Sequence, residues 1–249
     1  MNTTEAIDLD LMRHSGSILR ETLEFLSTTF IVPGISTLDI SNKATEIICS
    51  YEGATPSFLG YLGFPAATCI SVNEQVVHGI PLGNKIIKDG DLVSVDCGVS
   101  YKGHFTDACR TVGVGNVDYR AKKLIKITSE ALDRGIAAAL VGGYVGDISF
   151  AVQMHVERNR FAVSLDLVGH GIGRDLHLPP SIPNYGPPGQ GERLEDGACL
   201  AIEPVVFDGP SKVVVQEDAW TIVSEQGNLS AHFEDTIILT RAGPEIITR

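Results

Sequence analysis

The sequence predicts an α+β domain built from two halves that repeat the same order of elements. In each half, two stretches with helical periodicity are followed by two apolar strand patterns, and each strand pair carries two carboxylates. The chain has 249 residues, which is enough for one sizeable core and within the range of one domain. We therefore expect a single domain over residues 1–249, with pseudo-twofold halves that meet at a shared sheet.

The first half should begin with two helices and a group of short strands. Apolar residues recur at helical spacing from residue 5 to about 29, and Pro33-Gly34 ends that pattern. A second helix should run from residue 37 to about 50. Residues 55–77 are rich in aromatic and β-branched side chains broken by glycine and proline, which indicates strands and loops before a turn at residues 78–81.

An apolar strand pair with two acids follows in the first half. Residues 92–101 form one strand pattern that contains Asp96, Lys102-Gly103 is a turn signal, and residues 104–112 return with Asp107. Two carboxylates in an apolar hairpin are costly to bury unless a positive charge lies between them. A structural ion pair or exposure to solvent is the alternative.

The second half repeats this order. Helical periodicity covers residues 119–140 and 147–159, with a break at Gly142-Gly143. His170 should lie in a glycine-rich turn, a strand at residues 198–206 carries Glu203, and a last strand at residues 231–239 carries Glu234. The pseudo-twofold arrangement would bring Asp96 and Asp107 to face Glu203 and Glu234 across the sheet.

Four carboxylates and one imidazole are the donors of a site for two divalent cations. Carboxylate oxygens suit hard first-row cations, and one imidazole suits Mn, Fe, Co or Zn. Taken singly, each residue has a plainer explanation: His170 could be structural or exposed, and Glu234 could be an acid that faces solvent. The hypothesis rests on the five residues together.

The composition narrows the function classes. Hydrophobic residues make up 43% and charged residues 20%, as in ordinary globular proteins, and no apolar run approaches the roughly 20 residues of a membrane span. The first residues carry acid where a secretory signal would carry base, so we expect a cytoplasmic protein. The net charge of −12 argues against direct nucleic-acid binding. None of the five cysteines falls in a CxxC pair, so we expect reduced core residues.

Short motifs in a fixed order resemble those of the type I methionine aminopeptidases, the short form of the pita-bread metallopeptidases. They cover nearly the whole chain: Pro33-Gly34-Ile35-Ser36-Thr37, Ser71-Val72-Asn73-Glu74, His78-Gly79-Ile80-Pro81, Lys88-Asp89-Gly90-Asp91, His170-Gly171-Ile172-Gly173-Arg174, Ile202-Glu203-Pro204, Ala219-Trp220-Thr221 and Leu229-Ser230-Ala231. The resemblance implies one catalytic metallopeptidase domain, residues 1–249, with a central antiparallel sheet flanked by helices. It also implies removal of the N-terminal methionine from nascent proteins and peptides, with preference for a small second residue.

The resemblance also assigns roles to single residues. The metal ligands would be Asp96, Asp107, His170, Glu203 and Glu234, holding two divalent ions (Co, Mn, Fe or Zn), with Asp107 and Glu234 as bridges. Glu203 would also carry a proton from water to the leaving amine, while His78 and His177 would contact the substrate amide and its developing oxyanion. The partners would be N-termini of nascent polypeptides, the ribosome being one place to meet them, and the protein would be a monomer.

The methionine side chain would enter a pocket of aromatic and sulfur-containing residues. By position these are Phe58, Tyr61, Phe64, Cys69, Leu176 and Trp220, although each could equally be plain core. Two of them depart from the commoner family pattern: Phe58 stands where Cys is common, and Leu176 stands where Phe is common. Leu178, where an acid is usual, and Asp235, where His is frequent, depart from it as well.

Two alternatives come from other function classes. One is a proline-directed aminopeptidase of the same fold, whose members usually carry an additional N-terminal domain. The other is a non-catalytic peptide-binding module, which commonly loses metal ligands, whereas all five are present here.

Overall fold

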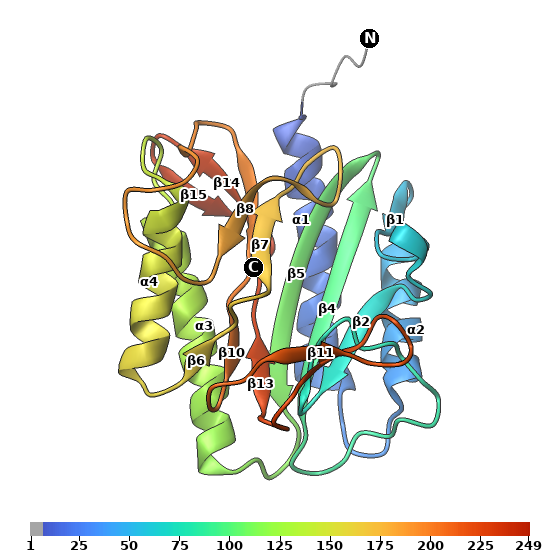
Figure 1. The fold of residues 1–249 in the computed structure, drawn as a ribbon. Coiled ribbons are helices and arrows are strands. Elements are labelled where there is room, and N and C mark those ends of the chain that lie inside the picture. The colour runs from blue at the N-terminus through green and yellow to red at the C-terminus, as the bar shows by residue number, and fades with distance from the viewer. Residues whose placement is uncertain (1–6) are drawn as a thin grey trace.

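The computed structural model describes residues 7–249, which form antiparallel sheets covered by two helix pairs (Figure 1). Its helices are α1 (Leu9–Phe25), α2 (Thr37–Cys49), α3 (Tyr119–Ala138) and α4 (Val145–Arg158). A π-helical turn, Leu26–Phe30, continues α1, and a single 3₁₀ turn spans Tyr61–Gly63. The expected helices are thus confirmed, and the α+β class with them.

Local hydrogen bonds set where the helices begin. The carboxylate of Asp8 accepts from the amides of Asp10 and Leu11, so α1 begins at Leu9. Residues 7 and 8 therefore precede the helix, and the expected start at Glu5 lies outside the described residues. A capping box of Ser36 and Asp39 begins α2.

The first half is organised around one long antiparallel hairpin. Strands β4 (Leu92–Tyr101) and β5 (His104–Gly113) pair along their whole length, with Asp96 opposite Cys109 and Gly98 opposite Asp107. Strands β1 (Ala54–Pro56) and β2 (Thr68–Val72) both pair with β4. Helices α1 and α2 cover this sheet and bury a core with it, which includes Ile18, Leu19, Ile40, Ile48 and Val95.

The second half contains a five-stranded antiparallel sheet in the order β15-β14-β9-β7-β8. These strands are β7 (Val168–Gly171), β8 (Leu178–Pro183), β9 (Cys199–Ile202), β14 (Asp235–Thr240) and β15 (Gly243–Ile246). A three-stranded sheet, β13-β10-β6, consists of β6 (Ala162–Val163), β10 (Val205–Phe207) and β13 (Ser230–His232). Another three-stranded sheet, β11-β12-β3, consists of β3 (Gln75–Val77), β11 (Val213–Val215) and β12 (Ile222–Ser224).

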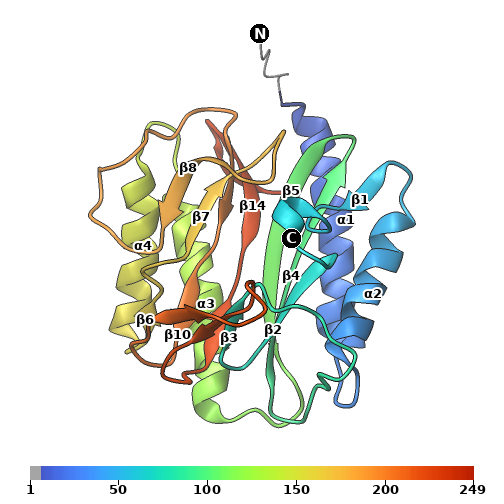
Figure 2. The same cartoon turned by 45° about the vertical axis from the view of Figure 1, so that its right-hand side comes forward.

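The two halves lie side by side in both views, with α1 and α2 against the first and α3 and α4 against the second (Figures 1 and 2). Their sheets meet where β5 passes the start of β14. One isolated backbone bridge joins them there: the amide of Cys109 donates to the Glu234 carbonyl over 3.2 Å, and the amide of Glu234 donates back over 3.1 Å.

Three sequence expectations about the second half need correction. The expected strand at residues 198–206 is split into β9 and β10 around Glu203 and Pro204, since Pro204 has no N–H for a ladder. The expected strand at residues 231–239 is split into β13 and β14 around Glu234. His170 lies on β7 and not in a turn.

Two expectations from composition can also be compared with the structure. The five cysteines are free, and four are buried, but Cys49 is exposed at the end of α2. Of the helices in residues 7–249, none has the length and apolar character needed to span a bilayer.

Candidate metal centre and peptide pocket

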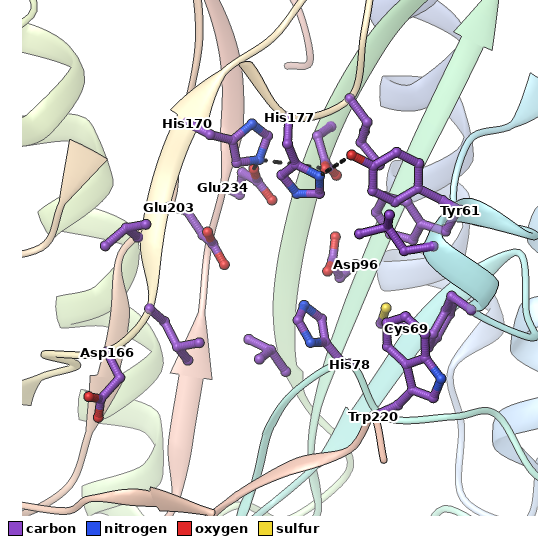
Figure 3. Close-up of a pocket in the computed structure, with 18 residues that line it drawn as sticks. Tyr61, Cys69, His78, Asp96, Asp166, His170, His177, Glu203, Trp220 and Glu234 are labelled. Carbon is purple, nitrogen blue, oxygen red and sulfur yellow. Dashed lines mark hydrogen bonds and ion pairs between the residues drawn. The ribbon is translucent and has the colours of Figure 1, made fainter. Parts of the chain in front are cut away.

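A cavity of about 280 Å³ opens between the two halves, and every candidate site residue predicted from the sequence lines it (Figure 3). These thirteen residues are Phe58, Tyr61, Phe64, Cys69, His78, Asp96, Asp107, His170, Leu176, His177, Glu203, Trp220 and Glu234. Five further lining residues did not come from sequence reasoning: Leu62, Val77, Asp166, Leu167 and Val168. The cavity therefore brings together side chains that are up to 176 positions apart, from Phe58 to Glu234.

The hairpin of the first half places two carboxylates on one face. Asp96 lies opposite Cys109, and Asp107 lies opposite Gly98, so the two acids are diagonal neighbours on the same side of the ladder. Gly98 leaves room beside them, because a Cβ at this position would lie 2.0 Å from Ser57 Oγ and 2.8 Å from the Phe58 ring. The glycine thus lets Phe58 reach the cavity.

The second half supplies its carboxylates from matching breaks in two paired strands. Glu203 follows β9 and Glu234 precedes β14, and the register places Asp235 opposite Ile202. A residue in a break is freed from strict strand alternation, so both acids can turn toward the cavity. Both carboxylates are largely shielded from solvent, since the Glu234 side chain is 3% exposed and the Glu203 side chain is 15% exposed.

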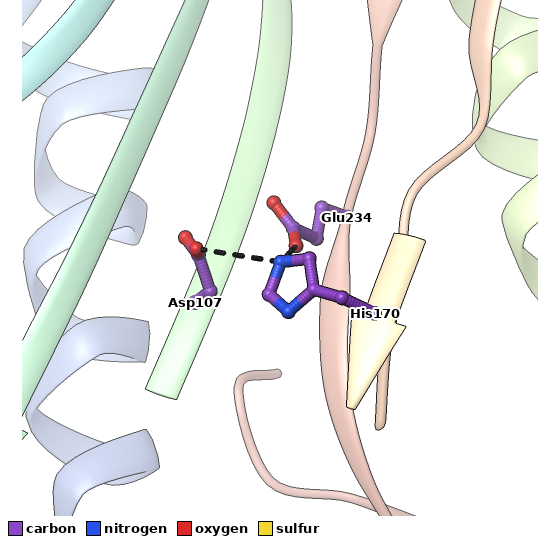
Figure 4. Close-up of side chains that lie close together, drawn as sticks. All are labelled: Asp107, His170 and Glu234. Atoms are coloured by element: carbon purple, nitrogen blue, oxygen red, sulfur yellow. Dashed lines mark ion pairs between the residues drawn. The ribbon is translucent and has the colours of Figure 1, made fainter. Parts of the chain in front are cut away.

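His170 approaches the carboxylates from β7 (Figure 4). Its Nε2 lies 3.8 Å from Glu234 Oε1 and 4.0 Å from Asp107 Oδ2. Its Nδ1 lies 3.0 Å from the carbonyl of Gly171, which can only accept, so Nδ1 carries the proton and Nε2 keeps its lone pair. These three residues form a cluster that could hold a metal ion.

The charges of this cluster are not balanced by the protein alone. Burial and the neighbouring carboxylates raise the pKa of Asp107 and of Glu234 well above their ordinary values, and burial raises the pKa of Asp96 to about 7. Within the described chain, Asp96 Oδ1, Asp107 Oδ1 and Glu234 Oε1 are buried without a hydrogen-bond partner. Orphaned carboxylate oxygens beside an imidazole lone pair fit divalent cations.

A second buried histidine, His232 on β13, was missed by the sequence reasoning. Its side chain is 1% exposed, and its Nε2 lies 3.0 Å from Glu203 Oε1 and 3.8 Å from Glu234 Oε2. Burial raises the pKa of Glu203, but the neighbouring His232, His170 and His78 outweigh it and lower that pKa below its ordinary value. The available signal was the spacing of His232 two positions before Glu234 in a strand pattern.

His78 and His177 line the same cavity as the carboxylates. His78 precedes Gly79, where a Cβ would lie 2.3 Å from the Ile70 carbonyl oxygen, so only glycine allows this close approach to β2. The ring of His177 lies 4.3 Å from that of His170, and its Nδ1 is 3.0 Å from the Tyr61 hydroxyl. Burial, with the neighbouring His170, lowers the pKa of His177 to about 4, so this imidazole is neutral near pH 7.

The remaining predicted residues form an apolar recess next to the carboxylates. Phe58, Phe64, Cys69 and Leu176 are buried together with Tyr61 and Trp220 packed against them. Phe64 and Trp220 meet edge to face, with centroids 5.1 Å apart. Figure 3 shows Tyr61, Cys69 and Trp220 on the side of the cavity opposite to Glu203 and Asp166. The site is thus polar and acidic at one end and aromatic at the other.

The fold and this acidic, histidine-containing centre define a pita-bread metallopeptidase. The pattern of Metallopeptidase family M24 matches residues 10–241, and the chain belongs to this family. It is 50% identical over 241 residues to a methionine aminopeptidase of Clostridium perfringens, which covers 97% of this chain and 96% of that protein. It is 45% identical to methionine aminopeptidase 1 of Bacillus subtilis over 242 residues, again 97% and 96% of the two chains. The family resemblance read from the motifs is confirmed.

Solved structures agree with this assignment. The crystal structure of methionine aminopeptidase from Thermotoga maritima is similar with a TM-score of 0.94 and 44% identity, over 98% of this chain and all of that one. An Xaa-Pro dipeptidase from Bacillus anthracis matches 97% of this chain and 60% of its own length with a TM-score of 0.76 and 24% identity, a likeness of fold alone. These neighbours share the pita-bread fold, so the predicted fold class is confirmed.

Proposed function

We propose that this chain removes the N-terminal methionine from nascent proteins and peptides by metal-assisted hydrolysis, with preference for a small second residue. One observation carries the proposal: a cavity that joins an acidic, imidazole-containing end to an aromatic recess containing a cysteine. The first end suits a free α-amino group and a polarised peptide carbonyl, and the second suits a thioether side chain. The names of the relatives at 40–50% identity support the same reaction.

We propose that five residues hold two divalent ions of Mn, Fe, Co or Zn. Asp107 and Glu234 would bridge the ions, Asp96 would complete one site, and His170 with Glu203 would complete the other. When bound, such a pair of cations supplies Lewis acidity and an activated water near neutral pH. The unpartnered carboxylate oxygens of Asp96, Asp107 and Glu234 support this ligand set.

Glu203 is the proposed proton carrier. The histidines around it keep its pKa below its ordinary value, so it is ionised at pH 7 and can accept a proton from the attacking water. It can then deliver this proton to the leaving amine. His232, at 3.0 Å, would hold the carboxylate in place during both transfers.

His78 and His177 are the proposed contacts to the peptide amide and to the oxyanion that develops on its carbonyl. A neutral imidazole can donate one hydrogen bond, and the lowered pKa of His177 keeps it neutral. When the Tyr61 hydroxyl donates to His177 Nδ1, the ring proton is on Nε2, which then serves as the donor.

The methionine side chain would occupy the recess of Phe58, Phe64, Cys69, Leu176 and Trp220, with Tyr61 at its edge. Polarizable sulfur and aromatic edges favour a thioether, by roughly 0.3–1.5 kcal/mol for a good contact. The departures at Phe58 and Leu176 place a large side chain at one position and a smaller one at the other, which would conserve the volume of the recess.

The wider setting follows from this reaction. We propose a single catalytic domain over residues 1–249, working in the cytoplasm as a monomer on N-termini of nascent chains, including at the ribosome, without direct nucleic-acid contact. A proline-directed peptidase and a binding module remain as alternatives in the test. A module that had lost catalysis would not need all five proposed metal ligands around one cavity.

The test is amino-acid release by metal-stripped protein that is re-supplied in turn with Mn, Fe, Co and Zn. Paired peptides would begin Met-Ala, Met-Leu, Leu-Ala and Ala-Pro. We expect metal-dependent release of methionine from Met-Ala, and weak release from the other three. Release from Ala-Pro alone would instead support the proline-directed peptidase, and no release despite bound metal would support the binding module.

A further inference from the structure

The two proposed bridging ligands come from strands that share no regular ladder. Asp107 is on β5 and Glu234 precedes β14, and the backbone contact between these segments is the isolated bridge between Cys109 and Glu234. A single bridge fixes a register weakly, because no further backbone pair extends it into a ladder; side-chain hydrogen bonds, such as those of Thr111 with the His232 backbone, flank it instead. Side chains on the reverse side of this bridge must therefore contribute to the separation of the two carboxylates.

Arg110 spans this junction from behind the cavity. Its Nη1 donates to the carbonyl of Glu234 over 2.6 Å and to that of Cys109 over 2.9 Å, so it holds both partners of the bridge. Its Nη2 donates to Asp235 Oδ1 over 2.6 Å and to the Thr248 carbonyl over 3.1 Å. The planar guanidinium thereby fixes four oxygens from β5, β14 and the segment after β15.

Asp235 completes the arrangement with no exposure to solvent. Besides Arg110, it accepts from the Thr248 hydroxyl over 2.7 Å and from the Arg249 side chain. Thr248 Oγ1 in turn accepts from the amide of Thr236 over 3.1 Å. Position 235 departs from the family pattern in the sequence, and its fully buried carboxylate is ion-paired with the partly buried Arg110.

The same network reaches the other bridging ligand. The amide of Asp107 donates to Thr236 Oγ1 over 2.9 Å, and this hydroxyl donates to the Asp107 carbonyl over 2.7 Å. The backbone of Asp107 is therefore held by Thr236, and that of Glu234 by Arg110. The contacts run continuously from Arg110 through Asp235 and Thr248 to Thr236.

We propose that Arg110 and Asp235 are positioning residues that hold the two halves in register at the metal centre and so set its affinity for divalent metal. The inference rests on the proposed metal centre and not on which peptide is cleaved. Partners that orient metal ligands typically change metal affinity by roughly 10- to 100-fold when they are replaced. The Arg110–Asp235 pair contacts the backbone of the ligand Glu234 and not its side chain, so its effect on metal affinity is indirect.

The test compares Asp235→Asn with a matched change elsewhere, Glu245→Gln. Glu245 is likewise paired with arginine, since it accepts two hydrogen bonds from Arg13 at 2.8 and 2.9 Å, but that pair joins α1 to β15, away from the bridge. Mn²⁺ binding to the metal-stripped proteins would be measured by calorimetry, well below the unfolding temperature of each. Hydrogen exchange of the Cys109 and Glu234 amides would be followed in the same samples.

We expect Asp235→Asn to bind Mn²⁺ roughly 10- to 100-fold more weakly than wild type and to lose exchange protection at those two amides. Glu245→Gln should match wild type in both. Should Asp235→Asn fail to fold, Arg110→Lys and Thr248→Val give milder changes, since lysine cannot span the four oxygens and valine removes one hydroxyl. We expect both to weaken binding in the same direction.

Two results would overturn the inference in distinguishable ways. If wild type binds Mn²⁺ and the folded Asp235 or Arg110 variants bind it as tightly as Glu245→Gln does, the positioning role is wrong and the proposed function stands. If wild type binds no divalent metal, the metal centre is wrong, and the positioning role falls with it.

Discussion

Removal of metal should make stability depend on pH in a direction opposite to that given by ion-paired carboxylates, whose pKa values are lowered by folding. The pKa of Asp96 is raised by burial from 3.8 to about 7 in the folded protein without metal. Between those two values the folded chain binds more protons than the unfolded chain, so stability is full below about pH 4 and is lost as the pH rises toward 7. Asp107 and Glu234, whose pKa values are also raised, act in the same direction, whereas His177 and Glu203, whose pKa values are lowered, oppose them in part.

The magnitude follows from the pKa of Asp96. Each pKa unit is worth about 1.4 kcal/mol, so a rise from 3.8 to about 7 corresponds to roughly 4 kcal/mol between acid and neutral pH. This is a large share of the roughly 5–15 kcal/mol by which domains are stable. Bound cations should reverse the loss, and a metal at about 100 times its dissociation constant adds roughly 2.7 kcal/mol.

Urea unfolding with and without Mn²⁺, at several values between about pH 5 and pH 8, measures this directly. The metal-stripped protein should lose stability as the pH rises, and the loaded protein should not. Asp96→Asn should flatten the pH dependence of the stripped protein and weaken its response to Mn²⁺, while Asp166→Asn, an exposed acid that also lines the cavity, should change neither. Stability of the stripped wild type that rises with pH would refute the reasoning.

Three further predictions concern single residues of the site. Glu203→Gln should lower kcat by roughly 10²- to 10⁴-fold while metal analysis still finds bound metal, and loss of the metal would show that its main role is ligation. His78→Ala should lower kcat by roughly 10²- to 10³-fold at unchanged metal content, and release of metal would contradict its role as a substrate contact. Gly98→Ala should lower the free energy of unfolding in urea by roughly 1–3 kcal/mol and raise KM for methionine peptides. The reason is that its Cβ would collide with Ser57 and push Phe58 into the recess. An unchanged KM would contradict this.

Much of the fold could be predicted because its periodic patterns are long. Strand β4 and helix α3 are long enough for their hydrophobic patterns to distinguish strand from helix in the sequence. The turn signal at Lys102-Gly103 fixed the hairpin, and the hairpin places Asp96 and Asp107 on one face. The alternative of an exposed acid at Glu234 is wrong, since its side chain is 3% exposed.

Pro204 is a local signal for the break between β9 and β10, but the break at Glu234 has a tertiary cause and could not be predicted. Apolar residues continue on both sides of Glu203 and Glu234, so the local pattern reads as one strand in each case. Along each segment the strand exchanges its partner at the break, from β14 to β13 in the first segment and from β10 to β9 in the second. These breaks are where two acids leave the ladder, so the sequence reasoning selected the acids but not the backbone course that positions them.

His232 and Asp235 were hidden for a similar reason. Each is a buried polar residue in an apolar strand, and its role is defined by partners far away in the sequence. His232 contacts Glu203, and Asp235 meets Arg110 from a position 125 residues away. Apart from the spacing of His232 two positions before Glu234, pair contacts of this kind leave no local pattern in a single sequence.

The most direct test of the account is mass spectrometry of one Met-Ala peptide, incubated with wild type and with Glu203→Gln at matched, measured metal content. The account predicts that wild type shortens the peptide by a single methionine residue, that chelation stops this, and that the variant leaves the peptide intact. Wild type that carries metal and leaves the peptide whole, or cleavage by the variant at the wild-type rate, would contradict it.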